Sequence, residues 1–257
     1  MMGEYTLMPN YHAEFESSPR WVRVYFNNEL LAGSKKAMLL RETNHLPRYY
    51  FPKKDVRMDY LQPSDRKAHS DLKGDGIFWH VRVGDKFANN AAFTFRNPPA
   101  NGPKLEDHVA FEWKKMDAWF EEDEEVFDYA RDPYKRVDVL PSSRHVKVAV
   151  EGTTIADTKR PWLLFETGLP TRYYIPRHDA RMDLLITSDT VTGCPYKGEA
   201  NHYSIKIGDK LHKDLAWYYR YPTLTCSKIQ GYLGFLNEKV DIYEDDKLLP
   251  RPKTPWS

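Results

Sequence analysis

The sequence predicts a mainly β protein that contains two copies of one domain. Short apolar or alternating runs are separated by turn residues, and no window of about a dozen residues carries the apolar stripe of an amphipathic helix. The chain is rich in aromatic residues and proline, with 17 Tyr, 12 Phe, 7 Trp and 18 Pro, which favours strands joined by turns. Several blocks also recur at one constant spacing, as expected of a duplicated domain.

The duplication is visible in three pairs of blocks, each offset by 124 positions. The pairs are 48–52 (RYYFP) with 172–176 (RYYIP), 57–59 with 181–183 (both RMD), and 64–65 with 188–189 (both SD). The register extends without a gap from Val22/Val146 to Asp117/Asp241. One chain therefore carries two versions of one site, and the differences between them are informative.

Alternation and turn residues place the strands in order along each copy. In the first copy, Asn27-Asn28, Gly84-Asp85 and Lys114-Lys115 are the predicted turns. The strands expected there are 21–26, 37–41, 49–51, 58–61, 77–83, 109–113 and 117–120. Those of the second copy are 146–150, 163–165, 173–175, 182–185, 203–207, 233–236 and 240–243, with a turn at 208–209. Short helical turns are expected at 98–105 and 222–229.

The expected organisation is a first repeat with an N-terminal extension (1–127), an ordered connecting strap (128–145) and a second repeat (146–257). The acidic run 121–125 is most simply a solvated hairpin end or linker. The strap carries turn residues and an aromatic at 131–138, which favours an ordered segment over a flexible tether. We expect the copies to pack with pseudo-twofold symmetry, as an internal pseudo-dimer that is monomeric overall.

The composition limits the classes of partner and the cellular compartment that we expect for this protein. Lys and Arg (38) nearly balance Asp and Glu (37), so no bulk field attracts nucleic acid or an anionic membrane. No stretch approaches the roughly 20 apolar residues that span a bilayer, and the N-terminus has no signal-peptide pattern. Only two cysteines occur, Cys194 and Cys226, which makes the reducing cytoplasm the expected compartment.

Several motifs together resemble a known family, the domain of unknown function 427. They are 131–134 (RDPY), 181–185 (RMDLL), 188–189 (SD), 194–198 (CPYKG), Trp217, Pro222 and 240–241 (VD). The resemblance covers the chain from about Val22 to Tyr243, as two tandem copies. It implies an Mss4-like fold, in which several coiled β-sheets form a compact domain. The family has also carried a label for nucleotidyl transfer, but no activity is implied beyond that label.

Arg181 and Asp183 lie two apart on an expected strand and so share one face. An arginine beside a carboxylate is suited to binding an anionic group. The alternative, which we favour, is an ion pair that locks the turn containing Ser188 and Asp189. Both copies keep these residues although they differ elsewhere.

The segment 194–199 (CPYKGE) is the stronger candidate, because the first copy has SDLKGD there. Tyr196 and Lys197 offer a phenolic proton and a cation, which can hold or protonate an oxyanion. Glu199 is a nearby carboxylate. Cys194 is a candidate nucleophile if Lys197 or Arg181 lowers its pKa, but a lone cysteine is more often a small buried residue.

Trp217 and Tyr219 replace Phe93 and Phe95 of the first copy. Aromatic walls with polar tips line many small-molecule pockets, although core packing explains at least one member of each pair. The change adds polar groups where the first copy has only hydrocarbon. The second repeat is therefore the one expected to hold a pocket.

No cofactor or metal is expected. The sequence has no Cys-x-x-Cys pair, no closely spaced histidines and no glycine-rich phosphate loop. These absences count against a conventional nucleotidyltransferase, which would also need paired carboxylates for magnesium.

The sequence thus predicts a small-molecule site, chiefly in the second repeat, with an enzyme using Tyr, Lys and carboxylate acid–base chemistry as one form of it. Its catalytic candidates are Tyr196, Lys197, Cys194 and Glu199. Its binding candidates are Arg181, Asp183, Ser188, Asp189, Trp217 and Tyr219. Two alternatives stay open: a non-catalytic structural or interaction module, and a nucleotidyltransferase-like activity.

Overall fold

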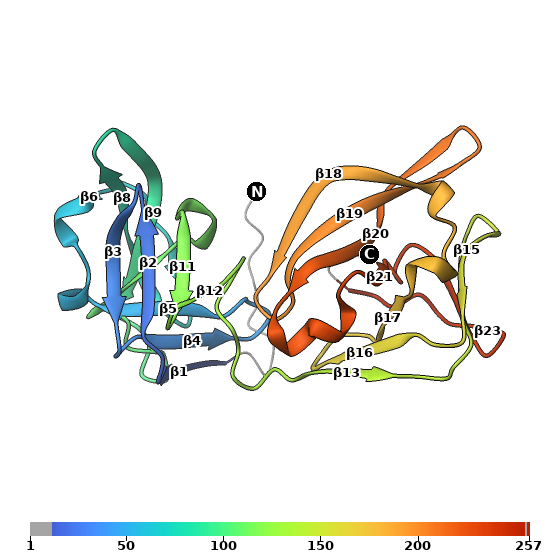
Figure 1. Ribbon diagram of the computed structural model, residues 1–257. Helices are drawn as coiled ribbons and strands as arrows, with labels where there is room; N and C mark the ends of the chain where they lie inside the picture. Colours follow the sequence, from blue (N-terminus) through green and yellow to red (C-terminus); the bar gives the residue numbers. More distant parts are fainter. Residues whose placement is uncertain (1–11, 255) are drawn as a thin grey trace. The chain divides into compact units, whose positions relative to one another are not determined.

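The computed structural model describes residues 12–254 and 256–257. The chain folds into two compact units, Met1–Asp132 and Pro133–Ser257 (Figure 1). Each unit is mainly β, as the sequence predicts, and each contains one large and one small antiparallel sheet. The units are described separately below.

The large sheet of the first unit has the strand order β1-β4-β5-β10-β9-β8-β6, with β7 paired to β8, and its small sheet has the order β12-β11-β2-β3. The strands are β1 (Ala13–Ser17), β2 (Val22–Phe26), β3 (Glu29–Ser34), β4 (Met38–Glu42), β5 (Arg48–Pro52), β6 (Leu61–Pro63), β7 (His69–Ser70), β8 (Gly74–Val83), β9 (Lys86–Arg96), β10 (His108–Phe111), β11 (Ala118–Glu121) and β12 (Glu124–Glu125). Short 3-10 helices are η1 (Lys53–Asp55), η2 (Met58–Tyr60) and η3 (Trp113–Lys115).

The second unit repeats this plan, with the order β13-β16-β17-β21-β20-β19-β18 in the large sheet and β15-β14-β22-β23 in the small one. The strands are β13 (Val137–Pro141), β14 (Val146–Val150), β15 (Thr153–Thr158), β16 (Trp162–Glu166), β17 (Arg172–Ile175), β18 (Leu185–Cys194), β19 (Gly198–Ile207), β20 (Lys210–Pro222), β21 (Leu233–Phe235), β22 (Asp241–Glu244) and β23 (Lys247–Leu248). The 3-10 helices are η4 (Arg177–Asp179), η5 (Met182–Leu184) and η6 (Leu224–Ile229).

The two units match strand for strand, except that β6 and β7 of the first unit correspond to the single strand β18 of the second. The edge strands β1 and β13 pair with β4 and β16 in the same register, so β13 lies within the segment 128–145 that was expected as a strap. A β-bulge interrupts β2 after Val24, and the corresponding bulge interrupts β14 after Val148. The acidic run 121–125 forms the end of the β11–β12 hairpin. The sequence predicted either a hairpin end or a linker here, and the structure has the hairpin end.

The expected ungapped register fails near its end. Ala92 pairs with Phe111, and Ala216 pairs with Phe235, which keeps the spacing of 124. In the next strand Tyr25 pairs with Ala118, whereas its counterpart Ala149 pairs with Asp241. The loop before β22 is therefore one residue shorter than the loop before β11, and Asp117 has no counterpart in the second unit.

Two local predictions are also wrong. Segments 58–61 and 182–185 were expected as strands, but their first three residues form the 3-10 helices η2 and η5. Segment 98–105 contains turns and no helix, whereas its counterpart contains η6 as expected. Runs of three or four residues carry too little periodicity to separate a strand from a 3-10 turn.

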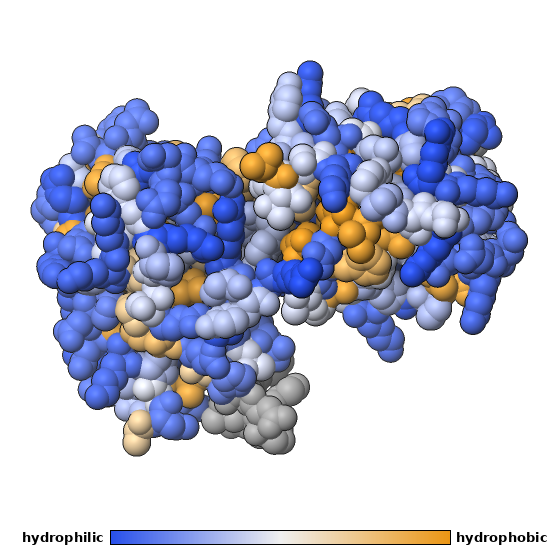
Figure 2. All heavy atoms as spheres, turned by 60° about the horizontal axis from the view of Figure 1, so that its bottom comes forward, coloured by the Kyte–Doolittle hydropathy of each residue, from blue (hydrophilic) through white to orange (hydrophobic). Residues whose placement is uncertain are grey.

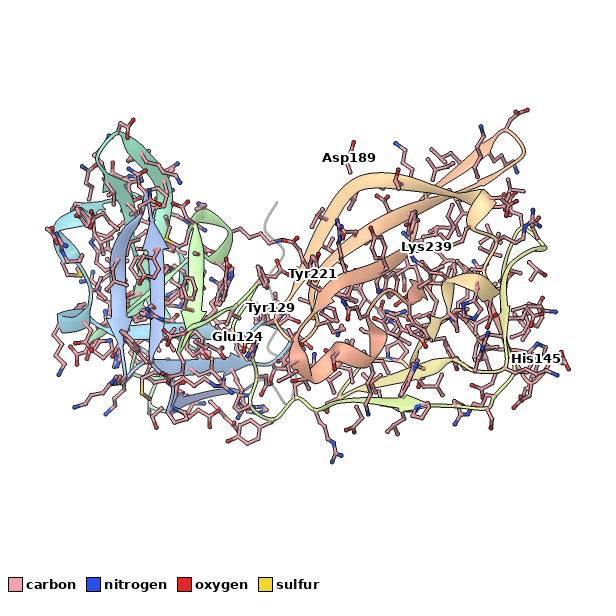
Figure 3. All side chains as sticks on the ribbon, in the orientation of Figure 1. Glu124, Tyr129, His145, Asp189, Tyr221 and Lys239 are labelled. Carbon is pink, nitrogen blue, oxygen red and sulfur yellow. The ribbon has the colours of Figure 1, made fainter. Side chains whose placement is uncertain are left out.

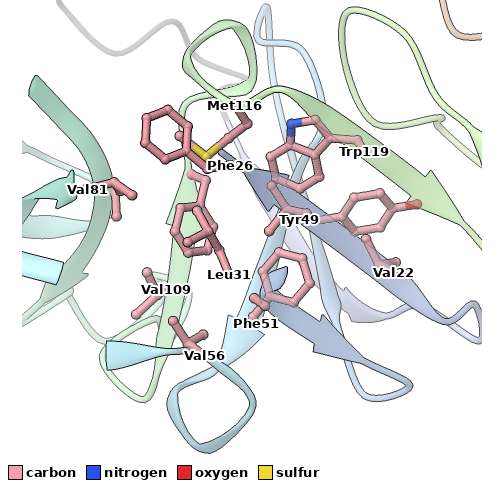
Figure 4. Close-up of a cluster of buried hydrophobic side chains, with 14 of the residues drawn as sticks. Val22, Phe26, Leu31, Tyr49, Phe51, Val56, Val81, Val109, Met116 and Trp119 are labelled. Atoms are coloured by element: carbon pink, nitrogen blue, oxygen red, sulfur yellow. The ribbon is translucent and has the colours of Figure 1, made fainter. Parts of the chain in front are cut away.

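Each unit buries side chains on both faces of its large sheet. In the first unit, Tyr49 and Phe51 of β5 pack with Trp119 of the small sheet in the core between the sheets (Figure 4). Tyr50, which lies between them, points to the opposite face and packs with Phe93. This alternation is what a strand covered on both faces requires. In the second unit, the corresponding cluster on this outer face of the large sheet, around Tyr174 and Tyr219, holds the candidate site.

Hydrophilic residues cover most of the face shown in Figure 2, with a group of hydrophobic residues on the second unit. Among the described residues, no helix is long and apolar enough to cross a membrane.

Candidate functional site

Lys197 is held in a buried ion pair. It lies in the turn between β18 and β19, where Cys194 pairs with Gly198. Its Nζ is 2.5 Å from Oε2 of Glu166, the last residue of β16, and the two side chains are only 12% and 3% exposed. The other carboxylate oxygen of Glu166 lies 3.3 Å from Nζ of Lys135. Glu166 thus joins two lysines and ties the turn between β18 and β19 to β16, a strand near the other edge of the same sheet.

This environment keeps Lys197 protonated. Burial by itself favours the neutral amine, but the nearby Cys194, Glu166 and Tyr174 favour the ammonium and raise the pKa of Lys197 above its usual value. A lysine in this state supplies a fixed positive charge and is not a general base at neutral pH.

The first unit has the same ion pair. Nζ of Lys73 lies 2.8 and 2.6 Å from the two oxygens of Glu42, at side-chain exposures of 14% and 6%. The glycine that follows each lysine has a positive φ, +80° at Gly74 and +94° at Gly198. The Lys–Gly turn and its glutamate are therefore a shared structural feature of both repeats.

The two units differ in the polar groups around that pair. In the second unit, Nε1 of Trp217 donates to the Tyr174 hydroxyl at 3.3 Å, and the rings meet edge to face. Tyr219 and Cys226 are buried in the same cluster. By the constant spacing, the first unit has Phe93, Phe95 and Gly102 in place of Trp217, Tyr219 and Cys226, and Ser70 in place of Cys194.

Gly234 accommodates the indole of Trp217. These residues are directly paired between β21 and β20, and a Cβ at Gly234 would lie 2.7 Å from the indole ring. The first unit has Ala110 opposite the smaller Phe93. The glycine and the tryptophan have therefore changed together, and a larger aromatic wall has formed in the second unit.

Burial keeps the acidic groups of this cluster neutral. It raises the pKa of Tyr174 to about 12, the pKa of Cys226 to about 11, and the pKa of Tyr219 well above its usual value. At neutral pH the two phenols and the Cys226 thiol are therefore neutral, and they lie with the Trp217 indole near the Lys197 ammonium. These neutral groups can donate hydrogen bonds.

We expect iodoacetamide to label at most one thiol of the native protein at pH 8. Cys226 is fully buried and its raised pKa disfavours the reactive thiolate, whereas Cys194 is partly exposed. Mass spectrometry of wild type and Cys194→Ser checks this expectation. Labelling of Cys226 in the folded Cys194→Ser variant would contradict the buried position of Cys226.

The structure separates the remaining candidates from Lys197. Arg181 and Asp183 are exposed and bind each other through two hydrogen bonds of 2.8 and 2.6 Å. Arg57 and Asp59 do the same in the first unit. Because η5 replaces the expected strand, these residues do not share a strand face. The guanidinium of each arginine is therefore bound to the carboxylate of the aspartate two residues later.

Ser188 takes part in another network. Its hydroxyl accepts from the backbone N–H of Thr190 at 3.1 Å, and its hydrogen bond to Asp214 is the main cause that lowers the pKa of Asp214. Asp189 is exposed and projects away from β18 (Figure 3). Glu199 is exposed on β19, opposite Gly193.

Tyr196 and Thr223 connect the Lys197 turn to the segment before η6. The Thr223 hydroxyl donates to the Tyr196 carbonyl at 2.6 Å, and its N–H donates to the Lys197 carbonyl at 3.0 Å. The ring of Tyr196 lies 5.7 Å from Nζ of Lys135. Of the predicted residues, the structure thus brings together Cys194, Tyr196, Lys197, Trp217 and Tyr219.

Three residues of this site were missed from the sequence: Lys135, Glu166 and Tyr174. A signal for two of them existed, because Glu42/Glu166 and Tyr50/Tyr174 are identical at the constant spacing, as Lys73/Lys197 are. The lysine and its glutamate are 31 residues apart, so only the fold shows that they meet.

A cavity of about 290 Å³ lies beside Glu166. It is lined by Arg136, Asp138, Phe165, Glu166, Thr167, Leu169 and Thr171. Arg136 is an exposed residue whose Nε lies 2.8 Å from Asp138. The cavity therefore combines charged groups with the apolar surfaces of Phe165 and Leu169, and Glu166, whose carboxylate holds Lys197, is one of its lining residues.

A second buried ion pair lies near Trp217. Arg172 makes two hydrogen bonds, of 2.7 and 2.6 Å, to Glu238, whose side chain has no exposed surface. The hydroxyl of Thr254 donates to the same carboxylate at 2.6 Å. Burial would raise the pKa of Glu238, but these hydrogen bonds outweigh it, and the pKa is lowered.

We expect this pair to make stability depend on acid pH. Because the pKa of folded Glu238 lies below the unfolded value, its contribution is present above about pH 4.5 and is lost as the pH falls further. Glu238→Gln should reduce the slope of the unfolding free energy between about pH 5 and pH 3. Urea unfolding at several pH values measures it. Glu112→Gln is the control, because its partner Arg48 is 41% exposed.

Among residues 12–254 and 256–257, no group of three or more His, Cys, Asp or Glu side chains is placed to hold a metal ion.

Comparison with known proteins identifies the family. No curated protein matches the chain. A family model described as a domain of unknown function (DUF427) matches twice, at residues 14–122 and 138–246. These matches cover most of the chain and coincide with the two structural repeats, including the edge strands β1 and β13. The chain therefore belongs to the DUF427 family and carries two tandem copies of its domain.

Proposed function

We propose that the second repeat binds a small anionic organic molecule in the cavity beside Glu166. The observation that carries the proposal is this cavity of about 290 Å³, which is close to the lower limit for ligand sites. Arg136, Asp138 and Glu166 line the cavity, and Lys135 and Lys197 contact the Glu166 carboxylate, so these five side chains together carry an excess of one positive charge. Phe165 and Leu169 supply apolar surface for the body of the ligand.

The predicted catalytic groups have a defined role within this proposal. Lys197 acts as a permanent cation, and Tyr196 is the phenol next to it in the turn. If the bound molecule reacts, these groups stabilise a developing oxyanion or donate a proton, and Glu166 replaces Glu199 as the carboxylate of the site. Arg181, Asp183 and Ser188 are not part of this site, because their hydrogen bonds lie elsewhere, and Asp189 is exposed and projects away from β18.

The alternative is a structural role for the Lys–Glu pair. The observation that favours it is the same pair in the first unit, Lys73 and Glu42, where the aromatic and thiol groups of the second unit are absent. A structural role predicts that ligands have no effect on either unit.

Thermal unfolding with a panel of small carboxylates and phosphates tests the proposal. A ligand at ten times its Kd should stabilise the protein by about 1.4 kcal/mol, which corresponds to a rise in Tm of roughly 5 °C. Arg136→Gln should abolish most of the rise, because Arg136 lines the cavity. Arg160→Gln is the control, since Arg160 is 66% exposed and pairs with Asp179. The proposal fails if no compound raises Tm, or if both variants respond like wild type.

A further inference from the structure

The two cysteines of the chain lie close together in the second unit. Cys194 is the last residue of β18, directly before the Lys197 turn, and Cys226 is a buried residue of η6. They are the only cysteines in the sequence, and both are free thiols. Neither is among the residues that line the cavity of the proposed function. Two neighbouring thiols are the groups that an oxidant can join in a disulfide.

Consecutive backbone hydrogen bonds connect the two cysteines. The N–H of Lys197 donates to the Cys194 carbonyl at 3.3 Å, and the N–H of Thr223 donates to the Lys197 carbonyl at 3.0 Å. The N–H of Cys226 then donates to the Thr223 carbonyl at 2.9 Å. Gly198, which pairs with Cys194, lies close to the same segment, since an added Cβ would be 3.4 Å from the Thr223 nitrogen. The segment that leads into η6 therefore lies directly against the turn that follows Cys194.

The electrostatic surroundings of the two thiols overlap. Burial lowers the pKa of Lys197, but Cys194 raises it, with a larger effect than Glu166. Burial also raises the pKa of Cys226, and the Lys197 ammonium is the main group that opposes this shift. After burial, both thiols contribute to the raised pKa of Tyr219. Both sulfurs therefore lie within electrostatic reach of one ammonium and of one phenol.

The corresponding positions of the first unit also meet. By the constant spacing, Ser70 and Gly102 stand where the second unit has Cys194 and Cys226. A Cβ at Gly102 would lie 2.3 Å from the carbonyl oxygen of Leu72, which belongs to the turn that follows Ser70. Position 102 thus contacts this turn directly and carries no side chain. The second unit has a thiol at each of the two positions, so the sequence change that created one sulfur also has its partner beside the same turn.

We infer that hydrogen peroxide oxidises this pair to a disulfide between Cys194 and Cys226, which makes the second repeat a site of reversible oxidation. The Cys194 sulfur attacks one peroxide oxygen, the O–O bond breaks, and the products are a sulfenic acid and one water molecule. The Cys226 sulfur then attacks the Cys194 sulfur, the S–S bond forms, and the hydroxyl of the sulfenic acid leaves as a second water molecule. Two thiols and one peroxide thus give one disulfide and two water molecules, which receive the two thiol protons.

Exposure sets the order of the two steps. Cys194 is partly exposed and meets the peroxide, whereas Cys226 is fully buried and meets only the oxidised Cys194. The Lys197 ammonium lies near both sulfurs and favours the thiolate form that reacts at each step.

Mass spectrometry of the reduced full chain after treatment with hydrogen peroxide at neutral pH tests this inference. Wild type should lose about 2 Da, the two thiol hydrogens, and dithiothreitol should restore the original mass. Tryptic digestion without a reductant should give one linked pair of peptides, 182–197 and 221–228, which contain Cys194 and Cys226. Iodoacetamide in urea should label neither cysteine of the oxidised chain.

Cys226→Ser separates the two steps, because the sulfenic acid at Cys194 then has no second thiol in the chain. Dimedone should trap the sulfenic acid in this variant and should trap little of it in wild type. The inference is wrong if peroxide leaves the mass of wild type unchanged, or if Cys194 gains about 32 Da as a sulfinic acid without a link to Cys226. A disulfide between two chains would overturn it as well. The ligand panel and Arg136→Gln test the cavity, so the two proposals can fail separately.

Discussion

Lys197→Met is expected to lower the free energy of unfolding of the second unit by about 3 kcal/mol. The substitution leaves the Glu166 carboxylate buried without its nearest cation, and breaking a buried pair in this way generally costs about 3–5 kcal/mol. Lys135, which is 3.3 Å from the other oxygen of Glu166, remains in place and keeps the loss at the lower end of that range. Chemical denaturation, followed by tryptophan fluorescence, measures the change.

Two further variants distinguish the effect of breaking the buried ion pair from the effect of removing any lysine. Lys210→Met removes a 70% exposed lysine that pairs with Glu151, and it should change the free energy of unfolding by less than about 1 kcal/mol. Adding Glu166→Gln to Lys197→Met should restore part of the loss, since no buried charge is then left without its partner. Equal effects of Lys197→Met and Lys210→Met would show that the buried pair contributes no more than a surface pair.

The pKa shift of Lys197 gives the same pair a signature at alkaline pH. Because the folded pKa is raised, the contribution is complete below about pH 10.5, the unfolded value, and is lost as the pH rises toward the folded value. Wild type should lose stability over that range more steeply than Lys197→Met. Parallel slopes would mean that Glu166 and its neighbours do not favour the ammonium.

The fold class and the repeats could be predicted from the sequence because both depend on local patterns. Tyr49, Tyr50 and Phe51 alternate between two buried faces, and Asn27-Asn28 adopts positive φ at both residues of a hairpin turn. The 3-10 helices η2 and η5 were missed, because three residues are too few for a period to appear. The one-residue deletion before β22 was missed as well, since it becomes visible only through strand register.

The site was predicted only in part, because most of its contacts are long range. The comparison of copies drew attention to the segment from Cys194 to Glu199, but it could not show that Lys197 meets Glu166 of another strand. The comparison also identified the replacement of Phe93 by Trp217. It did not identify the matching replacement of Ala110 by Gly234, which makes room for the indole. Such features follow from packing in three dimensions.

Gly74→Ala is expected to destabilise the first unit by more than about 3 kcal/mol. Gly74 has a φ of +80°, which disfavours any residue with a side chain, and an added Cβ would lie 2.2 Å from the Arg96 carbonyl oxygen and 2.4 Å from that of Asn97. These atoms belong to the backbone of the neighbouring strand and turn, so they cannot move away as a flexible side chain could. The Lys73 turn would have to open, and its ion pair with Glu42 would be lost with it.

Gly84→Ala isolates the backbone conformation from the clash. Gly84 also has a positive φ, +59°, but the nearest atom to an added Cβ is a side-chain nitrogen of Asn27 at 3.5 Å. Gly84→Ala should lower the free energy of unfolding by only about 1–2 kcal/mol, the usual penalty for a left-handed conformation. Urea unfolding of both variants, with hydrogen exchange of β8 and β9 as a local measurement, compares the two glycines. A similar loss in both would show that the Lys–Gly turn tolerates a side chain, and that close backbone approach does not explain why both repeats have glycine after the lysine.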